Sequence, residues 1–160
     1  MISLRKIDAK NIKSVCNLIV KENQKTYIES NTDSLLEAFL ALTSHFFAMP
    51  FAIYADEELI GFTMIEYGLM DDPLSPPVAD NNYCIASFMI GSDFQGHGYG
   101  KQALLKTIEY IKTFPCGEAN YCWLSYNKDN EVAKKLYFSI GFVETDEHYA
   151  AESVAILKLN

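Results

Sequence analysis

Residues 93–101 read Asp-Phe-Gln-Gly-His-Gly-Tyr-Gly-Lys, and the rest of the chain is organised around this stretch. Three glycines (Gly96, Gly98 and Gly100) alternate with other residues, after an apolar segment and before a strongly helical one. Glycine tolerates backbone conformations and close approaches that a Cβ atom forbids. Such a run can turn its amide N–H groups toward one point, and the following helix adds unpaired N–H groups and the positive end of its dipole. The pattern favours an anion-binding cradle over a ligand-free turn between strand and helix.

Length and composition indicate one soluble globular domain over residues 1–160. Of the 160 residues, 49% are hydrophobic and 21% are charged, which is ordinary for a globular protein. No stretch approaches the roughly 18 apolar residues of a membrane helix, and the first ten residues lack the apolar core of a signal peptide. We therefore expect a cytoplasmic protein that does not bind membranes.

The formal net charge is −8, which disfavours binding to nucleic acid and mildly favours a cationic partner. The cysteines and histidines form neither a CxxC pair nor the spacing of a zinc site, so no metal is expected. They are Cys16, Cys84, Cys116, Cys122, His45, His97 and His148.

Hydrophobic periodicity and turn residues predict a mixed α/β chain of order βααββ followed by βαβαββ. The first half is expected to have a strand at 2–7, a helix after Asp8, a helix over 33–47 that Pro50 ends, and a hairpin of strands 51–55 and 59–67. A proline-rich loop at 70–82 then leads to a strand at 83–90, whose continuous apolar run suits the centre of a sheet. Beyond the glycine stretch we expect a helix, a strand at 121–126, a helix from Asp129-Asn130 that Gly141 caps, and strands at 142–143 and 154–159.

Two familiar phosphate loops do not fit the glycine spacing. A Walker A loop needs GxxxxGK[ST], but no second glycine stands five positions after Gly96, and Gln102 follows Lys101. A dinucleotide fingerprint needs GxGxxG, and the glycines at 96, 98 and 100 do not match it.

The spacing Gln95-x-x-Gly98-x-Gly100 resembles the acetyl-CoA pyrophosphate loop of the GNAT acetyltransferase superfamily, which reads [RQ]xxGx[GA] between a central strand and a helix. A second family pattern follows about 30 residues later, Asn130-x-x-Ala133-x-x-x-Tyr137-x-x-x-Gly141-Phe142. The order of elements agrees over residues 2–159. The resemblance implies a mixed, mostly antiparallel central sheet flanked by helices, and acetyl-CoA as co-substrate.

Within that superfamily the chain is similar to bacterial spermine/spermidine and diamine acetyltransferases. The stretches that carry this likeness are residues 22–30 and the Phe51-Ala52-Ile53-Tyr54 segment that leads into residues 59–62. The implied function is transfer of acetyl to a primary amine, a polyamine or diamine, by direct attack in a ternary complex. The alternatives are another amine (a peptide N-terminus, a lysine or an antibiotic) and a non-catalytic acyl-CoA sensor. Many relatives are homodimers, which makes a homodimer possible here.

The resemblance also implies roles for particular residues. The backbone amides of the loop hold the pyrophosphate, and the backbone of the central strand pairs with the pantetheine arm. Tyr137 donates a proton to the departing CoA thiolate, and Asn130 either contacts the pantetheine or caps its helix. The cofactor set is Phe88, Met89, Ile90, Gln95, Gly96, His97, Gly98, Tyr99, Gly100, Lys101, Asn130 and Tyr137.

The general base does not follow from the resemblance. Polyamine acetyltransferases often carry a glutamate on the central strand where this chain has Ala86-Ser87. An ammonium group with a pKa of roughly 10 must lose a proton before it attacks, and Glu66, Tyr83 acting through water, and Glu29 remain as candidates. We expect carboxylates at the pocket rim to bind a distal ammonium. The predicted substrate contacts are Tyr27, Glu29, Glu66 and Tyr83, with Asp71 and Asp72 as further rim carboxylates.

Overall fold

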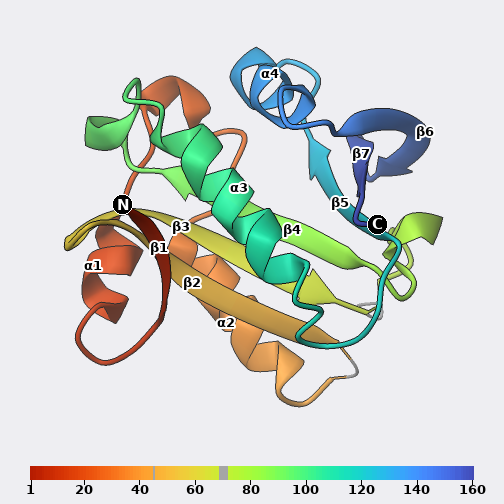
Figure 1. The fold of residues 1–160 in the computed structure, drawn as a ribbon, viewed down its shortest axis with the longest axis horizontal. Coiled ribbons are helices and arrows are strands. Elements are labelled where there is room, and N and C mark those ends of the chain that lie inside the picture. The colour runs from red at the N-terminus through yellow and green to blue at the C-terminus, as the bar shows by residue number, and fades with distance from the viewer. Residues whose placement is uncertain (45, 69–71) are drawn as a thin grey trace.

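The computed structural model describes residues 1–44, 46–68 and 72–160, which form one seven-stranded sheet with helices on both faces (Figure 1). The strands are β1 Ile2–Lys6, β2 Phe47–Ala55, β3 Glu58–Tyr67, β4 Tyr83–Ile90, β5 Tyr121–Tyr126, β6 Val143–Tyr149 and β7 Glu152–Lys158. The α-helices are α1 Ile12–Asn17, α2 Asn31–Ala41, α3 Tyr99–Ile111 and α4 Glu131–Phe138. Short 3-10 turns are η1 Glu22–Gln24, η2 Pro77–Ala79 and η3 Ser92–Phe94.

The sheet has the strand order β1-β2-β3-β4-β5-β7-β6. Every neighbouring pair is antiparallel except β4 and β5, which run parallel. The predicted mixed, mostly antiparallel sheet with flanking helices is therefore confirmed. Among the described residues, no helix is long and apolar enough to cross a membrane.

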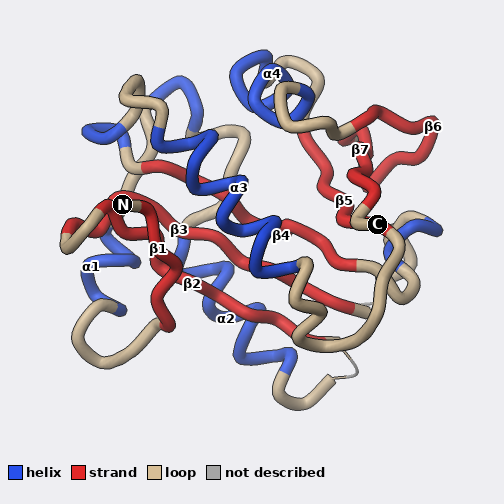
Figure 2. Tube along the Cα trace, viewed as in Figure 1, coloured by secondary structure: helices blue, strands red, loops and turns tan. Residues whose placement is uncertain are grey.

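Strands β4 and β5 meet only at their beginnings. Their pairing is limited to Tyr83 with Cys122 and Cys84 with Trp123, and in Figure 2 β5 and α4 turn away from β4 and α3. A register shift against β3 occurs at the same place, because Met64 pairs with Ser87 and the next β3 residue pairs with Ile85, which leaves Ala86 as a bulge. The bulge bends β4 where the two strands separate.

The two faces of the sheet are covered by different helices. Leu104, Ile108 and Ile111 of α3 pack in the largest core cluster with buried residues of β3, β4 and β5. On the opposite face Val15 of α1 and the inner side of α2 cover Phe62, Met64 and Met89. The side chains of β3 and β4 that point toward α2 therefore lie on a different face from α3.

The prediction for the second helix is wrong about where the helix ends. It begins at Asn31, where the Ser30 side chain accepts a hydrogen bond from the Asp33 amide, and it ends at Ala41 instead of Phe47. Phe47 is the first residue of β2, and Pro50 lies inside that strand opposite Met64. Strand β1 pairs with β2 only from Phe51 onward, so at Pro50 the strand has a neighbour on one side alone. A proline, which lacks an amide donor, is tolerated in such an edge position.

Candidate active site

The glycine loop leaves the end of β4 and enters α3 through two left-handed residues. Gly96 has φ +86° and Gly98, the N-cap of α3, has φ +76°. A Cβ atom at either position would meet no other atom within 4 Å. Backbone conformation, and not crowding, is therefore the reason for glycine at both sites.

The amide groups of this loop are free to bind an anion. Among the hydrogen bonds of the described residues, none has a backbone N–H of residues 95–98 as its donor. The first N–H groups of α3 have no acceptor within their own helix. The exposed Lys101 side chain stands in the first turn of that helix. The loop thus presents consecutive unpaired donors next to one positive charge.

The Gln95 side chain fixes the position of the loop. Its amide nitrogen donates to the Gln24 side chain at 2.8 Å and to the Ile90 carbonyl at 2.9 Å. Gln95 therefore ties the loop to the end of β4 and to η1, and of its hydrogen-bond donors only the backbone N–H remains for a ligand. The rings of His97 and Tyr99 stack with 5.8 Å between their centroids.

The second family pattern lies beside the loop in space. A Cβ atom at Gly100 would stand 3.7 Å from Cδ2 of Leu136 on α4. Asn130 is the N-cap of α4, where its side chain accepts a hydrogen bond from the Ala133 amide at 3.2 Å. Of the two roles expected for Asn130, the structure shows the cap.

Tyr137 projects from α4 and its hydroxyl has no hydrogen-bond partner among the described residues. The ring packs against Tyr126 and Phe142, with centroids 6.1 and 6.0 Å away. Burial first, and then the charges of Glu152 and Cys84, raise the pKa of Tyr137 to about 12. The hydroxyl is therefore protonated at neutral pH and able to donate.

One edge of β4 is open for a ligand beyond the last pair with β5. After Cys84 the backbone of β4 on the β5 side has no strand neighbour, although the other edge remains paired with β3 as far as Ile90. The predicted pantetheine-binding residues, Phe88 to Ile90, lie on this open edge. An extended molecule with amide groups can pair there as an added strand.

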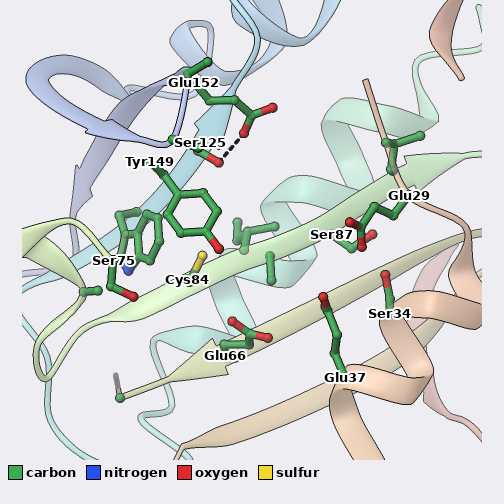
Figure 3. Close-up of a pocket in the computed structure, with 18 residues that line it drawn as sticks. Glu29, Ser34, Glu37, Glu66, Ser75, Cys84, Ser87, Ser125, Tyr149 and Glu152 are labelled. Carbon is green, nitrogen blue, oxygen red and sulfur yellow. Dashed lines mark hydrogen bonds between the residues drawn. The ribbon is translucent and has the colours of Figure 1, made fainter. Parts of the chain in front are cut away.

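A cavity of about 440 Å³ opens where β4 and β5 separate, on the α2 side of the sheet (Figure 3). Its size is typical of a small-molecule site. Its lining comes from α2 and the segment before it, from β3, β4 and β5, and from the β6–β7 turn. The lining residues are Ile28, Glu29, Ser34, Glu37, Glu66, Gly68, Ser75, Ala79, Cys84, Ile85, Ala86, Ser87, Trp123, Ser125, Tyr149, Ala150, Ala151 and Glu152.

The cavity is acidic. Glu29, Glu37, Glu66 and Glu152 line it, and among its described lining residues none is a lysine or an arginine. Burial, and after it the charge of Glu37, raises the pKa of Glu66 to about 7. Burial and the charges of Glu29 and Asp33 also raise the pKa of Glu37. These carboxylates repel one another, and no lysine or arginine among the described lining residues balances them.

Two hydroxyl groups and an aromatic pair complete the lining. Ser125 donates to Glu152 at 2.5 Å. Ser87 is only 7% exposed, and its side-chain oxygen has no hydrogen-bond partner among the described residues. The rings of Trp123 and Tyr149 meet edge to face with centroids 6.3 Å apart.

The structure brings some predicted substrate residues to the cavity and leaves others away from it. Glu29 and Glu66 line it, and Asp72 accepts a hydrogen bond from the Tyr149 hydroxyl at 2.8 Å. Asp71 lies outside the described residues. Tyr27 is not among the lining residues.

Tyr83 is placed in the core and not in the cavity. Its side chain is fully buried, and its hydroxyl accepts hydrogen bonds from the amides of Cys116 and Gly117 and donates to the Gly117 carbonyl. Tyr83 thus holds the segment before β5. This geometry gives no support to Tyr83 as a base or as a substrate contact.

Several lining residues were not found from the sequence. Glu37 stands three residues after Ser34 on the same face of a helix, but only the structure shows that Ser34 is buried and that this face turns to the sheet. Trp123, Tyr149 and Glu152 carried no comparable signal, because they reach the cavity through the pairing of β5, β6 and β7.

The sequence matches the acetyltransferase (GNAT) family over residues 12–142. The chain therefore belongs to the GNAT family, and it is an N-acetyltransferase.

Particular relatives agree with this assignment. The chain is 28% identical to a spermine/spermidine N(1)-acetyltransferase of Bacillus subtilis over 160 residues, which cover 99% of both chains. Its fold is similar to that of a spermidine N-acetyltransferase from Vibrio cholerae in complex with CoA and spermine, with a TM-score of 0.65, 18% identity, and coverage of 99% of this chain and 95% of that chain. An aminoglycoside acetyltransferase AAC(6')-Ib in complex with coenzyme A superposes with a TM-score of 0.76 at 12% identity and covers 99% and 95% of the two chains.

Proposed function

We propose that the protein transfers acetyl from acetyl-CoA to a primary amine of a polyamine or diamine. The observation that carries the proposal is the acidic cavity at the separation of β4 and β5, which has four glutamates and, among its described lining residues, no lysine or arginine. A flexible amine with several positive charges complements such a lining. The Bacillus subtilis relative, a spermine/spermidine acetyltransferase, supports the same choice of acceptor.

We propose that acetyl-CoA binds along the open edge of β4, between the glycine loop and the place where β4 and β5 separate. The pyrophosphate of acetyl-CoA is proposed to accept hydrogen bonds from the loop amides of residues 95–101, with Lys101 as a nearby charge. The pantetheine arm then follows the open edge of β4 along Phe88, Met89 and Ile90. This course leads the thioester to the bulge at Ala86, where the cavity begins.

Acyl transfer at this point needs three proton movements. The ammonium form of the amine first loses a proton to a carboxylate of the cavity. The neutral nitrogen then attacks the thioester carbonyl carbon, so that the C–N bond forms and the C–S bond breaks. Tyr137, whose pKa of about 12 keeps it protonated, is proposed to give its proton to the departing thiolate. The N–H proton that the nitrogen loses as the amide forms replaces the proton that Tyr137 gave.

Glu66 was predicted both as a possible base and as a substrate contact, and we propose the second role. The carboxylate whose charge acts on Tyr137 is Glu152, and Glu66 acts instead on Cys84. We propose that Glu152, held by Ser125, accepts the amine proton.

A screen of amines against acetyl-CoA tests the proposal. Calorimetry first establishes that CoA binds, and thiol release then reports transfer to spermidine, spermine, putrescine, an aminoglycoside and a peptide N-terminus. Thiol release that is fastest with the polyamines supports the proposal. Preference for the peptide or the aminoglycoside contradicts the acceptor, and binding of CoA without thiol release favours the non-catalytic sensor.

The cytoplasmic location and the homodimer remain predictions. The outermost strand on the C-terminal side, β6, carries Glu144, Asp146 and Glu147, so a dimer that paired this edge with itself would bring like charges together. Sedimentation of the purified protein measures the oligomeric state directly.

A further inference from the structure

Three of the four glutamates lie at two ends of the cavity. Figure 3 shows Glu152 bonded to Ser125 of β5, apart from Glu66 on β3 and Glu37 on α2. The charge of Glu152 acts on Tyr137, and we therefore assign Glu152 to the end where the acyl group is transferred. Glu37 and Glu66 form the far group, and Figure 3 shows both side chains reaching into the cavity, from α2 and β3.

The wall between the two groups is largely aromatic. Trp123 and Tyr149 line the cavity with their rings packed together. The pKa of Tyr149 is raised, mainly by burial and by the hydrogen bond to Asp72. The charges of Glu66 and Glu37 contribute further to this increase. Tyr149 therefore lies within reach of the far group. A methylene chain can pack on such a wall, and an ammonium group is attracted to the ring faces.

An unpaired group at the cavity independently indicates a ligand. Ser87, on the bulged part of β4, is 7% exposed, and its oxygen has no partner among the described residues. A buried hydroxyl without a hydrogen bond costs stability unless a ligand or solvent satisfies it. Ser87 lines the same cavity as the four glutamates.

We propose that Glu37 and Glu66 form a two-carboxylate subsite for a second ammonium group of the acceptor, so that the enzyme selects amines with at least two positive charges. Glu37 is then a specificity-determining residue of α2. This inference rests on the proposed function, because it concerns the far end of the same acceptor cavity. The new element is that a positive charge of the acceptor, far from the reacting nitrogen, determines which amines the enzyme accepts.

The titration of the free subsite agrees with this role. With a pKa of about 7, Glu66 is partly protonated at neutral pH because it is buried next to Glu37. A bound ammonium favours the ionised carboxylate, so binding of a diamine releases a proton from Glu66. The titratable groups that interact with Glu66 are Glu37 on α2, Cys84 on β4 and Tyr149 on β6. Glu29 acts in turn on Glu37, and Asp72 accepts the hydrogen bond of Tyr149.

The test compares spermidine with butylamine, which has one amine, on the wild-type protein and on Glu37→Gln. We expect Glu37→Gln to lower kcat/KM for spermidine about tenfold, mainly through KM, because a hydrogen bond to a charged group is lost. For butylamine the same substitution should change kcat/KM by less than about twofold. Glu37→Asp, which keeps the carboxylate, restores part of the preference for spermidine. Glu58→Gln, at the exposed start of β3, is the matched control and leaves both amines unchanged.

Equal effects of Glu37→Gln on the two amines, or no effect on either, overturn the subsite even if acetyl transfer occurs. Calorimetry of both amines against the CoA-bound protein separates the subsite from the reaction. Spermidine that binds in a Glu37-dependent way, with release of a proton at pH 7, supports the subsite even if no thiol is released. Thiol release with spermidine but without dependence on Glu37 leaves the proposed function in place and refutes the subsite.

Discussion

Replacement of Glu66 by glutamine is expected to stabilise the protein, although it removes a residue of the proposed site. Burial and the charge of Glu37 raise the pKa of Glu66 from 4.5 to about 7. The folded state therefore holds a proton that the unfolded state releases, and stability is lost as the pH rises from 4.5 to 7. At 1.36 kcal/mol for each pKa unit, the penalty at pH 8 is about 3 kcal/mol. Glutamine keeps the shape of the side chain without the charge.

Urea unfolding of the wild type and of Glu66→Gln at a series of pH values measures this effect. We expect the variant to have a higher free energy of unfolding at pH 8, by up to about 3 kcal/mol, and the difference to shrink as the pH falls to 5. Glu58→Gln, on the exposed end of β3, should show no such dependence. A variant that is less stable than the wild type at pH 8, or a difference that does not change with pH, refutes the assignment of a repelled, buried carboxylate.

Three further predictions concern the donor side and the proton transfers. Tyr137→Phe should keep CoA binding by calorimetry and lower kcat by about 100-fold, since general acid catalysis contributes 10²–10⁴-fold; an unchanged kcat would remove Tyr137 as the acid. Gly98→Ala should weaken CoA binding and lower stability by about 1–2 kcal/mol in thermal unfolding, because φ +76° is unfavourable for alanine. Gly100→Ala, where a Cβ makes only ordinary contacts with Leu136, should leave stability nearly unchanged. A larger loss of stability for Gly100→Ala than for Gly98→Ala would contradict the loop geometry. Glu152→Gln should lower kcat at pH 7 and lose less activity at high pH, where the amine is already neutral; an equal loss at every pH would argue against a role as base.

The parts of the fold that were predictable carry their signal in adjacent residues. The glycine loop needs two left-handed residues, and Gly96 and Gly98 provide them. The spacing from Asn130 to Tyr137 specifies a capped helix with the tyrosine on one face, and the structure has that cap. Strand β4 was recognised because nearly all of its residues are apolar.

The error at Pro50 had a physical cause that the local sequence does not contain. Proline ends helices and is rare in strands, so its presence favoured a helix that stops before it. It is tolerated in β2 because β1 does not extend that far, and this depends on the lengths of two separate strands.

The cavity at the separation of β4 and β5 was predictable only in part for a similar reason. Glu29 and Glu66 were expected near the substrate and do line the cavity, whereas Glu37 and Glu152 were missed. Their positions depend on the face that α2 turns to the sheet and on the turn between β6 and β7. Neither is visible in the residues that surround them in the chain. The buried Tyr83 shows the converse, since its hydroxyl is satisfied by backbone groups more than 30 residues away.

The most direct test of the central claim is the reaction itself, with acetyl-CoA and spermidine supplied to the wild-type protein. Thiol release measured against time and the acetylated amine identified by mass spectrometry report the two products together. The account predicts that spermidine accelerates thiol release and that acetylspermidine appears in equal amount. Binding of CoA with no amine that accelerates thiol release would contradict it.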